Sequence, residues 1–215
     1  MPLYTTDALI LRTYKLGESD RIVVFLTRDR GKKRGVAKNA RQSRRRFGGA
    51  LEPLTCGRVS YVERERRDLV HVNYVEAQRS PLSAADAEAL PYVGYFAELI
   101  DEWAQEGDPN ETLFRLGASM VEAMARGVPI DPLARYFEYW LLRLQGVYDD
   151  GARLSPEAHA FIEAARSSSP FAVGAVTVSR PALRELERAH RALMAAHLEK
   201  ELRSVRVLRD MKRDA

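Results

Sequence analysis

The sequence predicts an α+β protein in which a small N-terminal β-barrel is followed by an α-helical bundle. Residues 1–80 are rich in short β-branched and aromatic runs, whereas the rest shows apolar residues at helical spacing. The charge divides at the same place. Residues 1–80 hold 18 Lys and Arg against 9 Asp and Glu, while residues 81–215 hold 16 against 21. We therefore expect two domains, 1–80 and 81–215, and a polyanionic partner for the first.

Five short strands are expected in the first domain, and that number fits a small closed barrel. The alternation of side chains is clearest between Leu69 and Glu76, where it has the period of a pleated strand. Pro53 lies inside a strand run, so we expect it at a sheet edge or a bulge. The predicted strands and turns are, in order, 6–14, 20–27, a turn at Arg28–Gly31, 32–38, and two strands within 50–78 around a polar turn at Glu63–Asp68.

Five helices are expected in the second domain. One run is apolar on nearly all sides, which is typical of a central bundle helix. Asp108, Asp131 and Ser155 stand where N-cap residues are expected, and Glu111 can reach back to complete the first of these caps. The predicted helices are 90–107, 108–127, 131–146 (the apolar run), 155–166, and a last one from about Pro181 to His197 or beyond.

The composition excludes several classes of protein. No apolar run approaches the roughly 20 residues of a spanning helix, and the N-terminus lacks a secretory signal, so we expect a cytoplasmic protein without membrane contact. Cys56 is the only cysteine, which excludes an intramolecular disulfide and any zinc site built on several thiolates. Its apolar surroundings are typical of a small core residue rather than a catalytic thiol. The motifs of nucleotide hydrolysis and of serine hydrolases are missing.

The segment GKKRGVAKNARQSRRRFGG, residues 31–49, contains eight cations and no acidic residue. Its glycines favour a mobile loop between two strands, and five-stranded barrels commonly hold nucleic acid on their loops. Such a loop would bind phosphates without reading the base sequence. A merely solvated surface is the alternative. The expected DNA-binding residues are Lys32, Lys33, Arg34, Lys38, Arg41, Arg44, Arg45, Arg46 and Phe47, the last as a ring that stacks on a base.

Several pieces of the chain match the motifs of one known family: GESD at 17–20, VAKNAR at 36–41, GALEPL at 49–54, PLARYFEYWLLRLQG at 132–146 and LRSVRVLRDM at 202–211. They resemble the RecO family, the bacterial recombination mediators of the RecF pathway. The most specific similarity lies in the first 55 residues, and it extends to two helical segments near the middle and the end. Asn39 stands where the family usually has a glycine, and Asn tolerates left-handed torsions, so we expect the turn to survive.

The resemblance implies an N-terminal OB-fold, a helical C-terminal domain, and a non-enzymatic protein that binds single- and double-stranded DNA. It also implies ATP-independent annealing of strands coated with single-stranded DNA-binding protein, recognition of that protein's acidic, apolar C-terminal tail, association with RecR and help in loading RecA. Many members carry a four-cysteine zinc motif where this chain has VYDDGARLSPEA, residues 147–158. We therefore expect no zinc module, no metal and no cofactor, in a cytoplasmic protein associated with the nucleoid.

Arg135 occupies the position of an arginine in the family's helix motif, which suggests it as the receptor for the partner's tail. A carboxylate that follows apolar residues needs a guanidinium beside an apolar groove. The residues expected to bind the tail are Arg135, Tyr139, Leu142 and Arg143. The alternative is that Arg135 is a surface residue paired with Glu138, one turn away.

Two other functions fit parts of the sequence. Basic loops on such barrels serve RNA equally well, so an RNA-binding protein of the ribosome or of translation is one alternative. A magnesium nuclease is the other, and it would use the acidic residues of the first domain, Asp7, Glu18, Asp20 and Asp29. Neither explains the C-terminal similarity or the acidic helical half, so a DNA-binding adaptor is the preferred interpretation.

Overall fold

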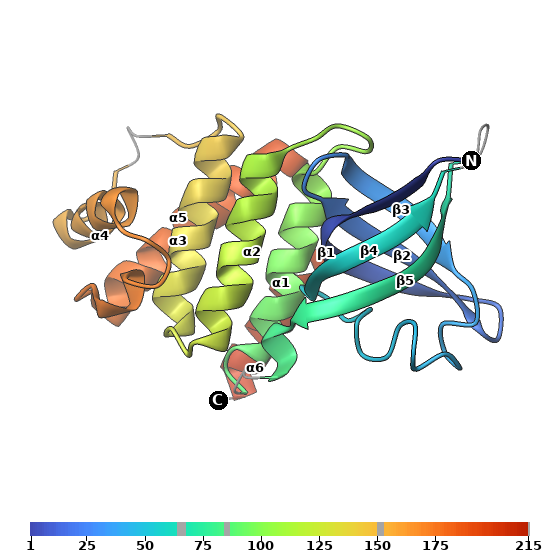
Figure 1. The fold of residues 1–215 in the computed structure, drawn as a ribbon. Coiled ribbons are helices and arrows are strands. Elements are labelled where there is room, and N and C mark those ends of the chain that lie inside the picture. Colours follow the sequence, from blue (N-terminus) through green and yellow to red (C-terminus); the bar gives the residue numbers. More distant parts are fainter. Residues whose placement is uncertain (64–67, 84–86, 150–152, 215) are drawn as a thin grey trace.

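The structure, a computed structural model, describes residues 1–63, 68–83, 87–149 and 153–214. Five strands come first and helices follow, which confirms the predicted α+β fold class (Figure 1). The strands are β1 (Leu3–Leu16), β2 (Asp20–Thr27), β3 (Gly31–Ala37), β4 (Cys56–Val62) and β5 (Val70–Arg79). The helices are η1 (Pro81–Ser83), α1 (Leu90–Trp103), α2 (Glu111–Ala125), α3 (Ile130–Leu144), α4 (Pro156–Ser167), η2 (Val173–Ala175), α5 (Arg180–Leu198) and α6 (Arg203–Asp214).

The five strands form a closed barrel in the order β1-β2-β3-β5-β4. β3 and β5 run parallel, and all other neighbours are antiparallel. β1 is long enough to pair with β4 through its first half and with β2 through its second, and its pairing with β2 shifts register between Ile10 and Arg12. Such a shift bends a strand and helps a small sheet to close. The result is the five-stranded OB-fold that the resemblance implied.

The segment between β3 and β4 differs from the prediction at Pro53, which lies in a turn before β4 and not within a strand. The next residue, Leu54, has a left-handed φ of 58°, which a strand does not allow. Two backbone hydrogen bonds, from Leu54 N to Ile10 O and from Ile10 N to Thr55 O, join this turn to β1. The polar turn predicted at Glu63–Asp68 falls largely on residues 64–67, outside the described part of the chain.

Of the three predicted N-cap residues, only Ser155 is confirmed. Ser155 caps α4 as expected, because its hydroxyl accepts from the backbone N–H of Ala158. The predicted cap of α2 is wrong, since Asn110 and not Asp108 accepts the N–H of Leu113. Asp131 lies inside the first turn of α3 and accepts a hydrogen bond from the Tyr92 hydroxyl.

The last predicted helix, from about Pro181 to His197 or beyond, corresponds to α5, and a separate helix, α6, follows it. α5 stops at Leu198, and Glu199 follows with a left-handed φ of 52°. After this break Glu98 of α1 caps α6, because its carboxylate accepts the backbone N–H groups of Arg203 and Ser204. Tertiary packing therefore sets the break, since the sequence there contains no glycine or proline.

The hydrophobic core is shared between the barrel and the helices. Ala8 and Ile10 of β1 point into the barrel, where they pack with Phe25 and Tyr61. Leu9 and Leu11 of the same strand, with Val24, Leu26 and Leu54, belong instead to the core of the helices. Figure 1 shows α1 and α2 lying against the barrel on this side. β1 is thus buried on both of its faces.

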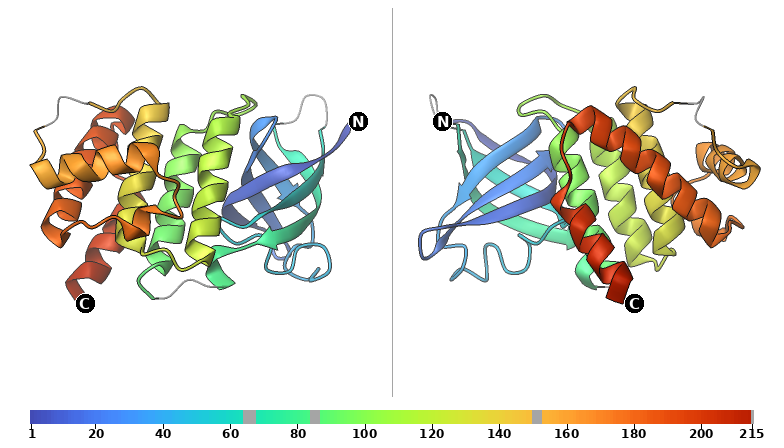
Figure 2. Two further views of the ribbon diagram at one scale, coloured as in Figure 1. Left: turned by 60° about the vertical axis from the view of Figure 1, so that its left-hand side comes forward. Right: turned by 180° about the vertical axis from the view of Figure 1, so that it is seen from behind.

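Charged side chains complete the junction at α1. The Asp101 carboxylate lies 3.2 Å from Arg12 Nε of β1 and 3.2 Å from Lys32 Nζ of β3. Lys32 also donates to the Asp101 carbonyl at 2.6 Å. α6 lies against the back of α1, as Figure 2 shows from behind. Val205 and Leu208 of α6, and Leu202 just before it, belong to the helical core. One helix therefore anchors the barrel on one side and the C-terminal segment on the other.

We predict that Leu9→Ala lowers the free energy of unfolding by about 3 kcal/mol, because it opens a cavity in the shared core. Native-state hydrogen exchange, read by mass spectrometry, should show a similar loss of protection in β4 and in α2. Leu3→Ala, at an exposed position of the same strand, is the control and should change neither. A loss of protection confined to the barrel would contradict a shared core.

Candidate functional site

The eight cations of residues 31–49 fall into two groups, one on a strand and one on the loop that follows it. Lys32, Lys33 and Arg34 lie on strand β3, which confirms the strand predicted at 32–38 and corrects the expectation that these three cations belong to a mobile loop. Gly35 lies beside β5, where an added Cβ would come within 2.6 Å of the Val70 side chain, so this glycine serves close strand packing.

The β3 cations face carboxylates of other elements. Lys32 pairs with Asp101, as described above, and its side chain is only 15% exposed. Lys33 Nζ lies 2.8 Å from Glu63 Oε1, and Arg34 Nη1 lies 3.9 Å from Glu106 Oε1. Because these charges are already compensated, the β3 group offers less to a phosphate backbone than the sequence suggested.

The second group lies on the loop that follows, residues 38–46, which is held against the β1–β2 turn. Asn39 adopts a left-handed φ of 53°, as expected of the residue that replaces a glycine. Its backbone N–H donates to Asp20 Oδ1 at 2.8 Å. Arg41 donates from its backbone to Ser19 O and from its guanidinium to Glu18 O. Glu18 and Asp20 thus take part in fixing the loop.

Arg46 braces the other end of the loop. Its Nη2 donates to Lys38 O at 2.7 Å and its Nε to Ser43 Oγ at 3.0 Å. Its carbonyl accepts the backbone N–H of Val75 in β5. The loop is therefore fastened to the barrel at both ends rather than hanging from it.

Phe47 follows directly, and the structure corrects its predicted role. Its ring is 1% exposed and packs inside the barrel with Ala50 and Leu51. A ring buried there cannot stack on a base. The exposed rings among the aromatic residues of the barrel are Tyr14 and Tyr74, each 40% exposed, and Tyr74 adjoins the strand residue that holds Arg46.

Lys38, Arg44 and Arg45 remain as the outward cations of the loop. All three are exposed, and within the described residues none of them forms an ion pair with a carboxylate. Side chains of this kind can neutralise phosphates and release condensed counterions. The loop, fixed in place and positively charged, is the candidate nucleic-acid interface.

The acidic residues considered for a nuclease do not come together. Asp29 accepts from Thr6 Oγ1 and Asp20 from the loop backbone, both in structural contacts. In the part of the chain that the structure describes, no three His, Cys, Asp or Glu side chains are grouped as metal ligands. Burial raises the pKa of the Cys56 thiol to about 12, so it stays protonated and unreactive at neutral pH.

The predicted tail-binding residues of α3 differ in solvent exposure, and they do not form one groove. Tyr139 and Leu142 are fully buried in the helical core, so they line no groove, which corrects that prediction. Arg143 is exposed and lies over the edge of the Tyr139 ring, with 6.0 Å between guanidinium and ring centroid. Arg135 does pair with Glu138, at 2.9 Å, but both side chains are buried and not on the surface.

Arg135 belongs to a buried polar network. Glu138 accepts a hydrogen bond from the Tyr95 hydroxyl at 2.7 Å and lies 3.1 Å from His190 Nδ1. Burial raises the pKa of Tyr95 well above its ordinary value, so the hydroxyl remains a donor. His190 is thus part of this network. The network fixes the Arg135 guanidinium on one side.

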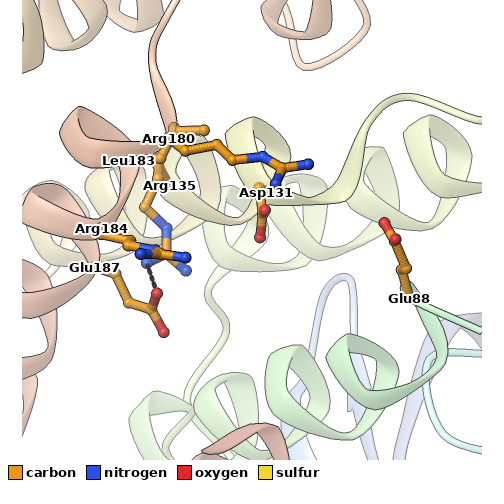
Figure 3. Close-up of a pocket in the computed structure, with 7 residues that line it drawn as sticks. All are labelled: Glu88, Asp131, Arg135, Arg180, Leu183, Arg184 and Glu187. Atoms are coloured by element: carbon orange, nitrogen blue, oxygen red, sulfur yellow. Dashed lines mark ion pairs between the residues drawn. The ribbon is translucent and has the colours of Figure 1, made fainter. Parts of the chain in front are cut away.

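The other side of Arg135 faces a cavity of about 420 Å³ between α3 and the start of α5 (Figure 3). Its Nε and Nη1 donate no hydrogen bond within the described residues. A neighbouring hollow of about 440 Å³ shares part of this lining and adds apolar side chains, among them Met124, Val128 and Ile130. The first cavity is lined by Glu88, Asp131, Arg135, Arg180, Leu183, Arg184 and Glu187.

Sequence reasoning missed the residues that α5 contributes. Arg180, Leu183 and Arg184 lie about one turn apart at the start of that helix, and only the fold brings them to Arg135. The one signal in the sequence was a pair of arginines four positions apart, which is common on solvated helices. Together the arginines and the apolar hollow could hold a carboxylate that follows apolar groups.

This protein is thus an α+β protein in which an OB-fold barrel carries a basic loop and shares its hydrophobic core with a helical bundle. Sequence comparison identifies the family within this class. The model of the Recombination protein O N terminal domain matches residues 1–81, and that of the Recombination protein O C terminal domain matches residues 84–150. The chain belongs to the RecO family.

Curated relatives agree with this assignment, and each is named DNA repair protein RecO. The relative from Koribacter versatilis is 42% identical over 149 residues, which are 69% of this chain and 61% of the relative. That from Geobacter metallireducens is 31% identical over 97% of this chain and 98% of the relative. That from Anaeromyxobacter sp. (strain K) is 39% identical over 65% of this chain and 55% of the relative. The matched part of the chain therefore spans less than two thirds of two of these relatives.

Within the described residues, no helix combines the length and apolar character needed to cross a membrane.

The burial of Phe47 gives a prediction that separates a core role from a stacking role. Phe47→Ala should lower the free energy of unfolding by about 3–5 kcal/mol, because it empties the barrel interior. Tyr74→Ala, which removes an exposed ring, should change stability little and is the control. Urea denaturation measures both. A stable Phe47→Ala protein that binds DNA weakly would restore the stacking role.

Proposed function

We propose that this protein is a non-catalytic mediator of DNA repair and recombination. It binds single- and double-stranded DNA, anneals complementary strands coated with single-stranded DNA-binding protein, and acts with RecR to help load RecA. Family membership supports the general role. The observation that carries the DNA-binding part is the fixed basic loop, whose outward cations have no carboxylate partner in the described residues.

The loop suits a mediator because it binds backbones and leaves bases free. Lys38, Arg44 and Arg45 can hold the phosphates of two strands at once, and this lowers the repulsion that keeps the strands apart. Tyr74 can stack on a base beside the loop. Since these contacts do not read sequence, any complementary pair can be annealed.

The Arg135 cavity suits the acidic, apolar tail of single-stranded DNA-binding protein. The terminal carboxylate would meet Arg135, with Arg180 and Arg184 around it, and the preceding apolar side chain would enter the neighbouring hollow. Docking there would bring the protein to coated strands, while the loop on the barrel engages the DNA.

Reversal of the loop charge tests the DNA-binding role. Arg44→Glu with Arg45→Glu should abolish acceleration of annealing between two coated oligonucleotides, measured by fluorescence quenching without ATP. On bare single strands, the slope of log affinity against log salt should become shallower by about 1.4, since two phosphate contacts are lost. The free energy of unfolding should change by about 0.5 kcal/mol or less, because both side chains are exposed.

The matched control is Arg188→Glu with Arg206→Glu, which makes the same change in net charge at exposed positions of α5 and α6 and should keep annealing. Wild-type protein that binds bare DNA without accelerating annealing would contradict the mediator role. If it also preferred structured RNA, the RNA-binding alternative would be favoured.

The proposed tail site makes a separate prediction. A fluorescein-labelled peptide of the tail should bind with its free terminal carboxylate about tenfold more tightly than with an amidated end, by fluorescence anisotropy. Arg180→Gln with Arg184→Gln should remove most of this difference, whereas Arg188→Gln should not. Equal affinity of the wild type for the two peptides would reject a carboxylate site.

A further inference from the structure

We propose that Glu187 is a built-in competitor for the carboxylate that the Arg135 cavity binds, and that Arg191 sets the strength of this competition. The inference rests on the proposed peptide docking and adds its regulation. Both residues lie on α5, one turn apart, and Glu187 lines the cavity.

One side of the Arg135 guanidinium is fixed by Glu138. Its Nη2 lies 2.9 Å from Glu138 Oε1, and both side chains are almost completely buried, at 3% and 1% exposure. Glu138 is itself held by Tyr95 and His190. With this side locked, the guanidinium cannot turn to find other acceptors, so its remaining donors have a fixed direction.

Those remaining donors are under-used. Arg135 Nη1 lies 3.6 Å from Glu187 Oε2, as the dashed line in Figure 3 marks, which is too long for a hydrogen bond. Arg135 Nε has no hydrogen-bond partner among the described residues either. Buried guanidinium donors without acceptors are unfavourable, so the site retains capacity to hold an anion more closely than it holds Glu187.

Arg191 explains why Glu187 does not close on Arg135. Its Nη2 donates to Glu187 Oε1 at 2.7 Å, and this hydrogen bond holds the carboxylate towards Arg191, one turn further along α5, and away from Arg135. The Glu187 side chain is 17% exposed, so it can move without unpacking the core. Glu187 is thus shared between two arginines, and one of them holds it back from the place of the ligand carboxylate.

Two opposite effects follow. Removing the Glu187 charge leaves Arg135 to the incoming carboxylate alone and should tighten binding. Releasing Glu187 from Arg191 lets it approach Arg135 and should weaken binding. A general field effect of charge near the cavity would instead act alike from any lining residue.

The experiment measures binding of the free-carboxylate tail peptide to the whole protein by fluorescence anisotropy. Glu187→Gln should bind about threefold or more tightly than the wild type. Glu88→Gln is the matched control, because Figure 3 places this acidic side chain on the opposite wall of the cavity and no ion pair joins it to Arg135 in the described structure. Its effect should be smaller. Thermal melts of both variants should stay close to that of the wild type.

A double-mutant cycle completes the test. Arg191→Gln should weaken binding about threefold, whereas Arg188→Gln, an equal loss of charge on the same helix, should have a smaller effect. In the Glu187→Gln background, Arg191→Gln should change nothing further, because the competitor is already absent.

Each outcome separates the two proposals. Equal gains from Glu187→Gln and Glu88→Gln, or an Arg191→Gln effect that persists without Glu187, would overturn the competition and leave the docking site intact. Binding by Glu187→Gln but not by the wild type would support a strong competitor. No peptide binding by either protein would reject the docking site and the competition together.

Discussion

The burial of β1 on both faces is the constraint on which the rest of the structure depends. Ala8 and Ile10 fill the barrel while Leu9 and Leu11 fill the helical core, so neither layer can separate without exposing the other. This fixes α1 beside the barrel and brings Asp101 within reach of cations on two strands. The basic loop is then the part of the barrel whose charge the helices leave uncompensated.

The cations of residues 31–49 look alike in the sequence, but the fold places them in two different surroundings. Those on β3 pair with carboxylates and stabilise the junction with the helices, whereas the outward cations of the loop are exposed to solvent. Arg135 also has two different sides, since Glu138 pairs with one side of its guanidinium while Nε and Nη1 on the other are buried without a hydrogen-bond partner among the described residues. In both places the fold fixes the position of cationic groups that the surrounding carboxylates do not fully satisfy.

The sequence was sufficient for the fold class and the five strands, because period-two alternation and turn residues are local signals. It placed Lys32 in a strand but could not show that its charge is compensated, since its partner Asp101 lies far along the chain. It placed Tyr139 in a groove although the same helix was expected to be central, and a central helix has little free surface. Arg135 was found from its motif, but the arginines of α5 that complete the cavity depend on tertiary packing.

The neutralisation of β3 by the helices bears on how pieces of this chain behave. In a fragment of residues 1–80, Lys32 and Arg34 would lose Asp101 and Glu106, and the outer face of β1 would meet water. Such a fragment would carry more naked positive charge, together with an apolar patch that promotes self-association. Its electrostatic attraction to polyanions would therefore be stronger than that of the intact molecule. The helices therefore limit the positive charge and the apolar surface that the barrel presents to solvent.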